Sequence, residues 1–167
     1  MQTLSLRTAE ARDAEATAEI YNYEVIHGFS TFDLTPRSDE EQRAWIAARR
    51  GAFSVIIAED TVLGVVGFAA LSTYRDRAGY RTTVENSIYV RRDYQRRGIG
   101  KLLLVRLLDV ARDSGFHTVI ARIEASSESS LALHRSLGFE KVGIEREIGR
   151  KHGRWLDSII MQKMLAE

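Results

Sequence analysis

The stretch Val90-Arg91-Arg92-Asp93-Tyr94-Gln95-Arg96-Arg97-Gly98-Ile99-Gly100-Lys101 joins an apolar, β-prone run to a leucine-rich helical pattern. This order predicts a strand, a turn and a helix. Gly98 and Gly100 let the backbone approach a ligand closely, and Arg96 and Arg97 add positive charge. The N-terminus of the following helix directs its free amides at the same place. The stretch therefore predicts a site for a phosphate or pyrophosphate.

Spacing excludes two well-known phosphate motifs. A Walker A loop needs a glycine where Gln95 stands and a hydroxyl residue where Leu102 stands. A dinucleotide fingerprint needs a third glycine at the position of Leu103. The remaining pattern, Gln-x-x-Gly-x-Gly on a strand-to-helix turn, resembles the pyrophosphate loop of the GNAT superfamily of N-acetyltransferases. From this motif alone, a basic surface turn that binds nothing is an equally good interpretation.

The composition indicates one ordinary globular domain over residues 1–167, with 44% hydrophobic and 28% charged residues. A net charge of +1 gives no global field toward nucleic acid or a membrane surface. The absence of cysteine excludes disulfides, thiolate metal sites and a cysteine nucleophile. The four histidines lack metal-ligand spacing, so no metal is expected. The longest nearly apolar run, 62–71, is shorter than the roughly 20 residues of a membrane helix, and acidic residues precede it near the N-terminus. These features favour a cytoplasmic protein.

Hydrophobic periodicity divides the first half of the chain into five elements. A strand is expected around Leu4, a helix from Asp13 to about His27, and a second helix from the capping box of Ser38 and Glu41 to about Arg50. Runs at 53–58 and 62–71 predict an antiparallel hairpin. Of the loop aromatics, Phe29 is expected to fill the core beneath its loop and Phe32 to form a pocket wall.

The second half predicts a strand at 82–90, a helix at 101–114, a strand at 118–123, a short helix at 129–137 and closing strands at 140–146 and 155–164. Along the strand at 82–90, Glu85, Ser87 and Tyr89 share one face and the alternate residues share the other. Together the elements predict an α+β fold, with one mixed, mostly antiparallel central sheet and helices on both faces.

Four further strings narrow the resemblance: Tyr-Asn at 21–22, Thr-Val-Glu-Asn-Ser-Ile-Tyr-Val at 83–90, Leu-His-Arg-Ser-Leu-Gly-Phe at 133–139 and Lys-His-Gly-Arg-Trp-Leu-Asp at 151–157. Together with the loop, they are similar to the phosphinothricin acetyltransferase family. This resemblance implies acetyl-CoA as co-substrate and a homodimer. It also implies acetylation of the free amino group of an amino-acid analogue such as phosphinothricin, methionine sulfoximine or methionine sulfone.

Acetyl transfer to an amine requires a group that accepts the ammonium proton. Glu85 lies on the strand that enters the loop, about 17 Å before Val90 at 3.3 Å per residue, and the family has a glutamate there. We assign Glu85 as the general base, acting directly or through water. The alternative is an exposed glutamate paired with Arg81 or Arg75. His134 matches a family histidine and is expected to act as a second acid or base or to contact the substrate, with a helix C-terminal cap as the alternative.

The resemblance also implies the remaining binding residues. Those expected to hold acetyl-CoA are Ile88, Tyr89, Val90, Gln95, Arg96, Arg97, Gly98, Ile99, Gly100, Lys101 and Ser127. Ser127 stands where related enzymes often have an asparagine, and its side chain is shorter. Those expected to hold the acceptor are Phe32, Arg75, Arg77 and Tyr80, because a guanidinium binds a carboxylate through two hydrogen bonds. Surface solvation is the alternative for each.

Two rival functions remain. The same fold could acetylate a protein N-terminus or another amine, and only the loop from Arg75 to Tyr80 speaks against this. A nucleic-acid or regulatory binding module could use the basic run at Arg91, Arg92, Arg96, Arg97 and Lys101. That run is short, has few stacking aromatics and is balanced by acidic residues elsewhere, so the enzyme is the favoured interpretation.

Overall fold

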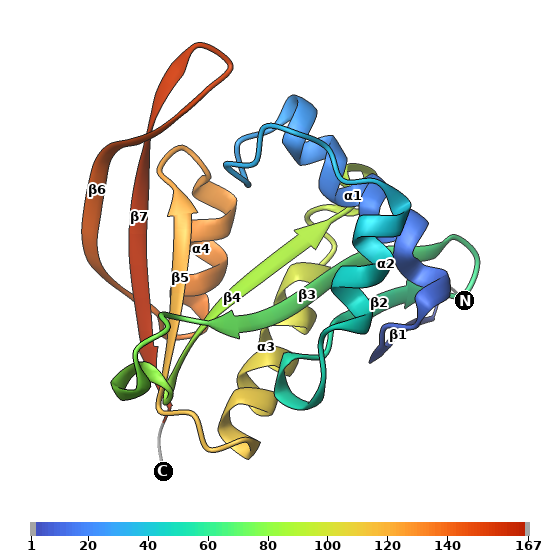
Figure 1. Ribbon diagram of the computed structural model, residues 1–167, viewed down its shortest axis with the longest axis horizontal. Coiled ribbons are helices and arrows are strands. Elements are labelled where there is room, and N and C mark those ends of the chain that lie inside the picture. Colours follow the sequence, from blue (N-terminus) through green and yellow to red (C-terminus); the bar gives the residue numbers. More distant parts are fainter. Residues whose placement is uncertain (1–2, 166–167) are drawn as a thin grey trace.

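A computed structural model describes residues 3–165 of the chain, and these form a seven-stranded sheet with the order β1-β2-β3-β4-β5-β7-β6 (Figure 1). The strands are β1 (Leu4–Thr8), β2 (Ile56–Asp60), β3 (Gly64–Thr73), β4 (Thr83–Val90), β5 (Thr118–Glu124), β6 (Glu140–Lys151) and β7 (Arg154–Met164). The helices are α1 (Ala14–His27), α2 (Asp39–Ala47), α3 (Ile99–Asp113) and α4 (Glu128–Ser136), with short 3-10 turns η1 (Ala11–Asp13), η2 (Gly51–Phe53), η3 (Ala78–Tyr80) and η4 (Arg92–Tyr94).

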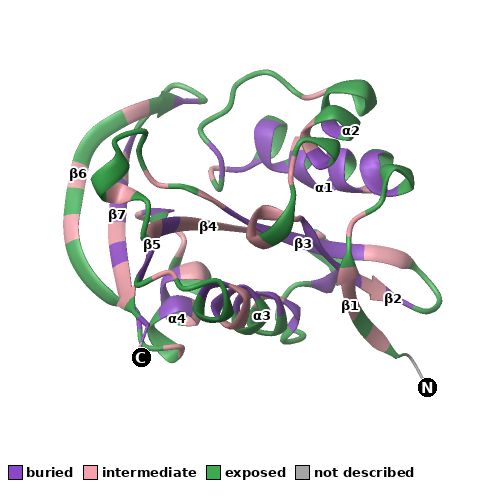
Figure 2. Cartoon of the chain, turned by 60° about the horizontal axis from the view of Figure 1, so that its bottom comes forward, coloured by how far each residue is buried: buried purple, intermediate pink, exposed green. Residues whose placement is uncertain are grey.

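The helices cover both faces of this sheet. Figure 2 shows α1 and α2 on one side of the central strands and α3 and α4 on the other. Each side has its own buried cluster: Tyr21, Val25 and Phe68 belong to the cluster under α1, while Leu103 and Leu107 belong to the cluster under α3. The predicted α+β class, with a mixed sheet between helices, is confirmed.

The alternation predicted for β4 is also confirmed. The Tyr89 ring packs at 5.1 Å from the ring of Tyr21 in α1, whereas Asn86 is hydrogen-bonded to His134 in α4. Neighbouring side chains of β4 therefore point to opposite faces of the sheet. Glu85 lies on the α1 face and Asn86 on the α4 face.

The strands β4 and β5 separate in the middle of the sheet. They are parallel and pair over three positions, from Thr83 with Thr118 to Glu85 with Ile120. Beyond Glu85 the two strands diverge, as Figure 1 shows, although β4 stays paired with β3 as far as Val90. A gap therefore opens in the sheet immediately after Glu85.

The helix α3 follows the turn after β4 and is amphipathic. Its buried residues are Ile99, Leu103, Leu104, Leu107, Leu108 and Ala111, which repeat at the spacing of one helical face. Gly115 follows its last turn with a φ of 78°, a left-handed conformation that favours glycine after a helix. Burial of this leucine-rich face fixes the start of α3 beside the end of β4.

The last two strands form a long hairpin whose length the sequence underestimated. The β6 strand continues to Lys151, beyond the predicted end at Arg146, after an irregularity between Glu145 and Gly149. Glu147 adopts a φ of 48° there, and its backbone N–H donates to Asp157 at 2.8 Å. A side chain of β7 thus holds the distortion and lets pairing resume at Gly149.

Other differences concern local structure near the N-terminal half. Phe53 lies in η2, so β2 begins at Ile56 instead. The helix α2 ends at Ala47, before the predicted end near Arg50, although the capping box of Ser38 and Glu41 is present. Asp13 precedes α1 without capping it, because its carboxylate binds Arg7 and the backbone of Glu10.

Candidate active site

A cavity of about 950 Å³ passes through the sheet where β4 and β5 diverge. Its lining includes Glu24, Phe32 and Glu85 from the α1 face, and His134 and Gly100 from the α4 face. Both mouths are therefore lined by residues that the sequence analysis selected. A ligand that threads the gap would meet different chemistry at each end.

The loop after β4 has the backbone of an anion site. Arg96 has a φ of 61° and Gly98 a φ of 81°, and left-handed residues beside ordinary ones turn successive N–H groups toward a common concavity. The first turn of α3 begins at Ile99 and adds its own unpaired amides. Gln95, Arg96, Gly98, Ile99, Gly100 and Lys101 all line this end of the cavity. The predicted phosphate loop thus lies at one mouth.

Side chains around this loop divide into paired and unpaired cations. Arg91 binds Asp93 at 2.7 Å, and Arg92 binds the buried carboxylate of Glu24 at 2.9 Å. Within residues 3–165, Arg96 and Arg97 form no ion pair, and the guanidinium of Arg97 lies 4.5 Å from the ring of Tyr94. The unpaired positive charge is therefore concentrated at the turn itself.

Tyr94 adds a second indication of a ligand. The residue is 4% exposed and lines the cavity, and its hydroxyl has no hydrogen-bond partner among residues 3–165. A buried hydroxyl without a partner costs roughly 1–3 kcal/mol. A polar group bound at this mouth would remove that cost, so the site suits a polyanionic ligand such as a pyrophosphate.

Gly100 holds the start of α3 against α4. A Cβ at this position would lie 3.3 Å from Cδ2 of Leu133, closer than nearly all such contacts. The short distance explains why a glycine stands at the second position of the motif, where the backbone must approach a neighbouring helix.

Glu85 lines the cavity on the α1 face. Its carboxylate is 3.7 Å from the guanidinium of Arg122 on β5, and Arg122 also binds Glu145 of β6 at 2.7 Å. The alternative interpretation, an ion pair of Glu85 with Arg81 or Arg75, is wrong, because Arg122 on the neighbouring strand supplies the cation. Burial raises the pKa of Glu85 above its ordinary value, and Arg122 opposes this shift.

His134 lies on α4 and is 3% exposed. Its Nδ1 donates to the carbonyl oxygen of Ser130 at 2.8 Å, and its Nε2 lies 3.1 Å from Oδ1 of Asn86. The ring therefore bonds within its own helix and to β4, and it caps none of the last carbonyls of α4. Burial lowers the pKa of His134 below its ordinary value, which favours the neutral imidazole at pH 7.

The structure does not bring Glu85 and His134 together on one face. Glu85 reaches the cavity from the α1 side of β4, and His134 reaches it from the α4 side, where Asn86 holds it. Two titratable groups thus flank the gap from opposite sides of the sheet. They can handle protons at different points of one bound molecule.

Four of the five remaining residues predicted to bind acetyl-CoA line the cavity. Ile88, Tyr89 and Val90 line the cavity along the unpaired edge of β4. Arg97 does not line it. Ser127 lines it at the start of α4 and makes no side-chain capping bond.

Of the four residues predicted to bind the acceptor substrate, one lines the cavity. Phe32 lines the cavity on the α1 face and is 40% exposed. Arg75, Arg77 and Tyr80 lie in the loop between β3 and β4 and are absent from the cavity lining. Arg75 instead lies 4.9 Å from the ring of Tyr74 and 5.5 Å from that of Tyr80. A role for these three residues in substrate binding stays a prediction.

Sequence reasoning missed several residues that line the site, among them Arg122, Glu145 and Glu24. Arg122 had a signal, because it is the single charge within the apolar run from Val119 to Ile123. Phe29 was expected in the core and lies outside both buried clusters. Its ring packs 5.5 Å from that of His152, and Arg154 lies 4.8 Å above it.

Residues 3–165 contain neither a metal-ligand cluster nor a helix suited to span a membrane. No group of three or more histidines, cysteines or carboxylates there could hold a metal ion. Within the same residues, no helix combines the length and apolar character that crossing a membrane requires.

Comparison with known proteins places this geometry in context. A family model described as an acetyltransferase (GNAT) domain matches residues 6–160. The L-amino acid N-acyltransferase MnaT of Escherichia coli (strain K12) is 40% identical over 165 residues, which cover 98% of this chain and 95% of that protein. The L-methionine sulfoximine/L-methionine sulfone acetyltransferase of Pseudomonas paraeruginosa (strain DSM 24068 / PA7) is 38% identical over 159 residues, 95% of this chain and 92% of that protein.

A solved structure agrees with the sequence relatives. It is a GNAT superfamily phosphinothricin acetyltransferase from Sinorhizobium meliloti in complex with acetyl-CoA. It superposes with a TM-score of 0.93 at 40% identity and covers 98% of this chain and 89% of its own chain.

Proposed function

The chain belongs to the GNAT family of acetyltransferases, and we propose that it transfers the acetyl group of acetyl-CoA to a small amino-acid analogue. The acceptor would be the free amino group of phosphinothricin, methionine sulfoximine or methionine sulfone. Relatives bearing these substrate names support this choice. We also propose a cytoplasmic location, where acetyl-CoA is available.

One observation carries this proposal: a single cavity connects the anion loop at Gln95–Lys101 to Glu85 through the gap between β4 and β5. The pyrophosphate of acetyl-CoA would lie at the start of α3, and its extended arm would follow the free edge of β4. Unpaired backbone groups of a diverging strand can bind such an arm, because they have no partner strand. The thioester would then lie near Glu85.

The reaction needs three groups, and the cavity offers a candidate for each. Glu85 would accept a proton from the acceptor ammonium, so that the neutral amine attacks the thioester carbonyl. Backbone amides along the opened strand would stabilise the negative charge on the carbonyl oxygen. The C–S bond then breaks, the amide forms, and CoA leaves as a thiolate that takes up a proton. His134 is our candidate for a group near that thiolate.

The acceptor would enter from the α1 face. Phe32 would contact its side chain, and Arg77 and Tyr80, with Arg75, would bind its anionic end. Because these three lie outside the cavity of one chain, their role depends on loop movement or on a second copy of the chain.

We also propose a homodimer. Several large apolar side chains of the β6–β7 hairpin are exposed, namely Val142 (55%), Ile144 (43%), Ile148 (56%), Trp155 (58%) and Met164 (66%). Exposed apolar groups that gather on one element favour an interface, and β6 is an edge strand with unpaired backbone. Sedimentation velocity would test this proposal, and a monomer at all micromolar concentrations would contradict it.

The experiment that tests the activity follows release of the CoA thiol with a panel of acceptors. The panel contains phosphinothricin, methionine sulfoximine, methionine sulfone, common amino acids and a peptide with a free N-terminus. We expect the first three to have the highest kcat/KM. Turnover confined to the peptide would favour acetylation of a protein N-terminus. Nucleic-acid binding without any affinity for acetyl-CoA would overturn the enzyme.

A further inference from the structure

Lys151 is an unusual residue for an edge strand, because it is charged and only 2% exposed. Its ammonium donates to two backbone carbonyl oxygens, that of Glu24 at 2.9 Å and that of Thr31 at 2.8 Å. Burial lowers the pKa of this lysine. The cost of burying such a group is offset only where it is well hydrogen-bonded. Lys151 therefore ties the end of β6 to α1 and to the loop after α1.

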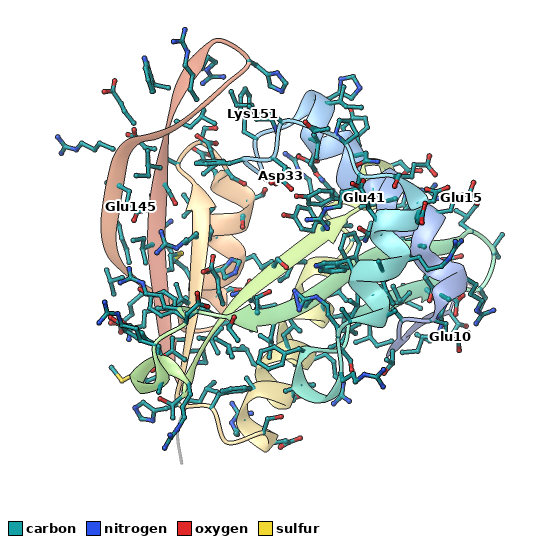
Figure 3. The ribbon with its side chains drawn as sticks, viewed as in Figure 1. Glu10, Glu15, Asp33, Glu41, Glu145 and Lys151 are labelled. Carbon is teal, nitrogen blue, oxygen red and sulfur yellow. The ribbon has the colours of Figure 1, made fainter. Side chains whose placement is uncertain are left out.

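Thr31 is also hydrogen-bonded to a side chain of α1. Its hydroxyl is hydrogen-bonded to the hydroxyl of Tyr21 at 2.9 Å, and the residue is 8% exposed. Tyr21 also donates to Asp33. Figure 3 shows Lys151 at the end of the hairpin beside the segment that carries Asp33. The backbone on both sides of Phe32 is thus fixed by α1 and by β6.

The ring of Phe32 packs directly on the backbone of Gly149. A Cβ at Gly149 would lie 2.6 Å from Cδ2 and 2.7 Å from Cε2 of that ring, distances that real side chains do not reach. Gly149 and Lys151 are two residues apart and share one face of β6. One strand face therefore holds both the ring and the loop that carries it.

We propose that Gly149 and Lys151 set the position of Phe32 and thereby determine which acceptor side chains fit the cavity. Lys151 is a positioning residue that acts through Thr31, and Gly149 determines specificity by leaving room for the ring. The Lys-His-Gly-Arg-Trp string at 151–155 thus begins with a residue whose buried bonds shape the acceptor end. This inference rests on the proposed function, in which Phe32 contacts the acceptor.

The main test is Gly149→Ala, with Gly143→Ala as its matched control. Both glycines lie on β6, but a Cβ at Gly143 would meet no atom within 4 Å. We expect Gly149→Ala to change the KM for the best acceptor about tenfold, within the range of a reshaped apolar pocket. The KM for acetyl-CoA should stay unchanged, and Gly143→Ala should alter neither.

A double-mutant cycle separates the ring from other effects. In the Phe32→Ala background there is no ring for the new methyl group to displace, so Gly149→Ala should change the acceptor KM by less than about twofold. Additive effects in the two backgrounds would overturn the proposal. So would a Gly149→Ala enzyme that matches Gly143→Ala with every acceptor.

Lys151 is tested without any substrate. Lys151→Met should speed amide hydrogen exchange in residues 28–36 more than Lys141→Met, a substitution at an exposed lysine of the same strand. Unchanged hydrogen exchange in Lys151→Met would show that Lys151 does not hold this loop in place. If the amino-acid analogues fail as acceptors but another amine is acetylated, the substrate claim fails, and the cycle is run with that amine.

Discussion

The Nε atom of Arg122 lies 3.7 Å from the carboxylate of Glu85, while another nitrogen of the same guanidinium donates to Glu145 at 2.7 Å. Glu85 therefore shares the guanidinium of Arg122 with Glu145, whose carboxylate lies closer to that guanidinium. Burial raises the pKa of Glu85, Arg122 lowers it, and Glu145 raises it. The proton affinity of the proposed base depends on three strands, β4, β5 and β6.

Glu85→Gln removes the proposed base while keeping the size of the side chain. We expect kcat to fall by about 10²- to 10⁴-fold, the usual contribution of general base catalysis. Acetyl-CoA binding, measured by calorimetry, should be retained because the anion loop is untouched. A kcat within a few-fold of wild type would remove Glu85 from this role.

Glu145→Gln should shift the pH profile of kcat/KM. The base works only when it is deprotonated, so activity falls as pH drops below its pKa. Removing the charge of Glu145 removes its repulsion of the Glu85 carboxylate, and Arg122 then interacts with Glu85 alone. Both changes lower the pKa of Glu85. The acid limb should therefore move to lower pH.

Arg122→Gln should move the same limb in the opposite direction, to higher pH, because an attraction is lost. Glu147→Gln is the control, since Glu147 is an exposed residue of β6, the strand that carries Glu145, and should leave the profile unchanged. Shifts of the same sign in the Glu145 and Arg122 variants would contradict the shared cation.

Much of this site could be predicted from sequence because its signals are local. The loop at 95–101 is one continuous string, and the alternation along β4 assigns Glu85 to the same face as Tyr89. The pairing of Glu85 with Arg122 could not be predicted in the same way. It depends on β4 lying parallel to β5 across the intervening helix, and no pattern within either strand gives that register. The same holds for Lys151, whose partners are 127 and 120 residues away in the chain.

Gly98→Ala should weaken acetyl-CoA binding. Gly98 has a φ of 81°, where a residue with a Cβ is strained by roughly 1–2 kcal/mol. The loop would either keep that strain or relax and misplace its amides. We expect the Kd for acetyl-CoA to rise about tenfold, as about 1.4 kcal/mol implies.

Gly115→Ala is the matched control for this change. Gly115 lies at the other end of α3 with a φ of 78°, and no atom would meet its Cβ within 4 Å. The two substitutions should lower the melting temperature alike, but only Gly98→Ala should affect acetyl-CoA. Equal Kd values for the two variants would show that the loop conformation at Gly98 is not needed for binding.

Asp13→Asn should destabilise the fold. Asp13 is 3% exposed, and Arg7 binds both of its oxygens at 2.8 Å. Losing these charge-assisted bonds should cost about 1.5–3 kcal/mol, because Arg7 loses one partner but keeps its ion pair with Glu59. Urea denaturation at pH 7 would measure this cost. Arg12→Gln, at a pair with side chains 65% and 60% exposed, should cost less than about 1 kcal/mol.

The cost at Asp13 should also depend on pH. Burial alone would raise the pKa of Asp13, but the bonds from Arg7 and the backbone of Glu10 outweigh it and lower the pKa. Because the pKa of Asp13 in the fold is lowered from its ordinary value of 3.8, the ionised carboxylate stabilises the fold at pH values above 3.8. This contribution is lost as the pH falls below 3.8. The difference between wild type and Asp13→Asn should therefore shrink in acid. A constant difference from pH 7 to pH 3 would contradict the ionised pair.

The environment of His134 makes a prediction about its titration. Both ring nitrogens face oxygens, the carbonyl of Ser130 and Oδ1 of Asn86, so the two bonds favour a ring protonated on both sides. Burial opposes this and prevails, so the pKa lies below the ordinary value of 6.5. NMR titration of the four histidines, with His134→Gln to assign the signal, should show the lowered pKa. At pH 7 the ring is then neutral, and with its proton on Nδ1 it has no hydrogen on Nε2 to donate to Oδ1 of Asn86.

Asn86→Asp tests which nitrogen faces β4. A carboxylate near Nε2 would stabilise the imidazolium, so the midpoint of His134 should rise above that of wild type. The other three histidines should titrate as before. An unchanged midpoint would mean that Asn86 does not face Nε2. A rise would leave His134 cationic at higher pH, and a thiolate leaving near it would then meet a positive charge. With methionine sulfone as acceptor, kcat for Asn86→Asp should in that case depend on pH through the new midpoint.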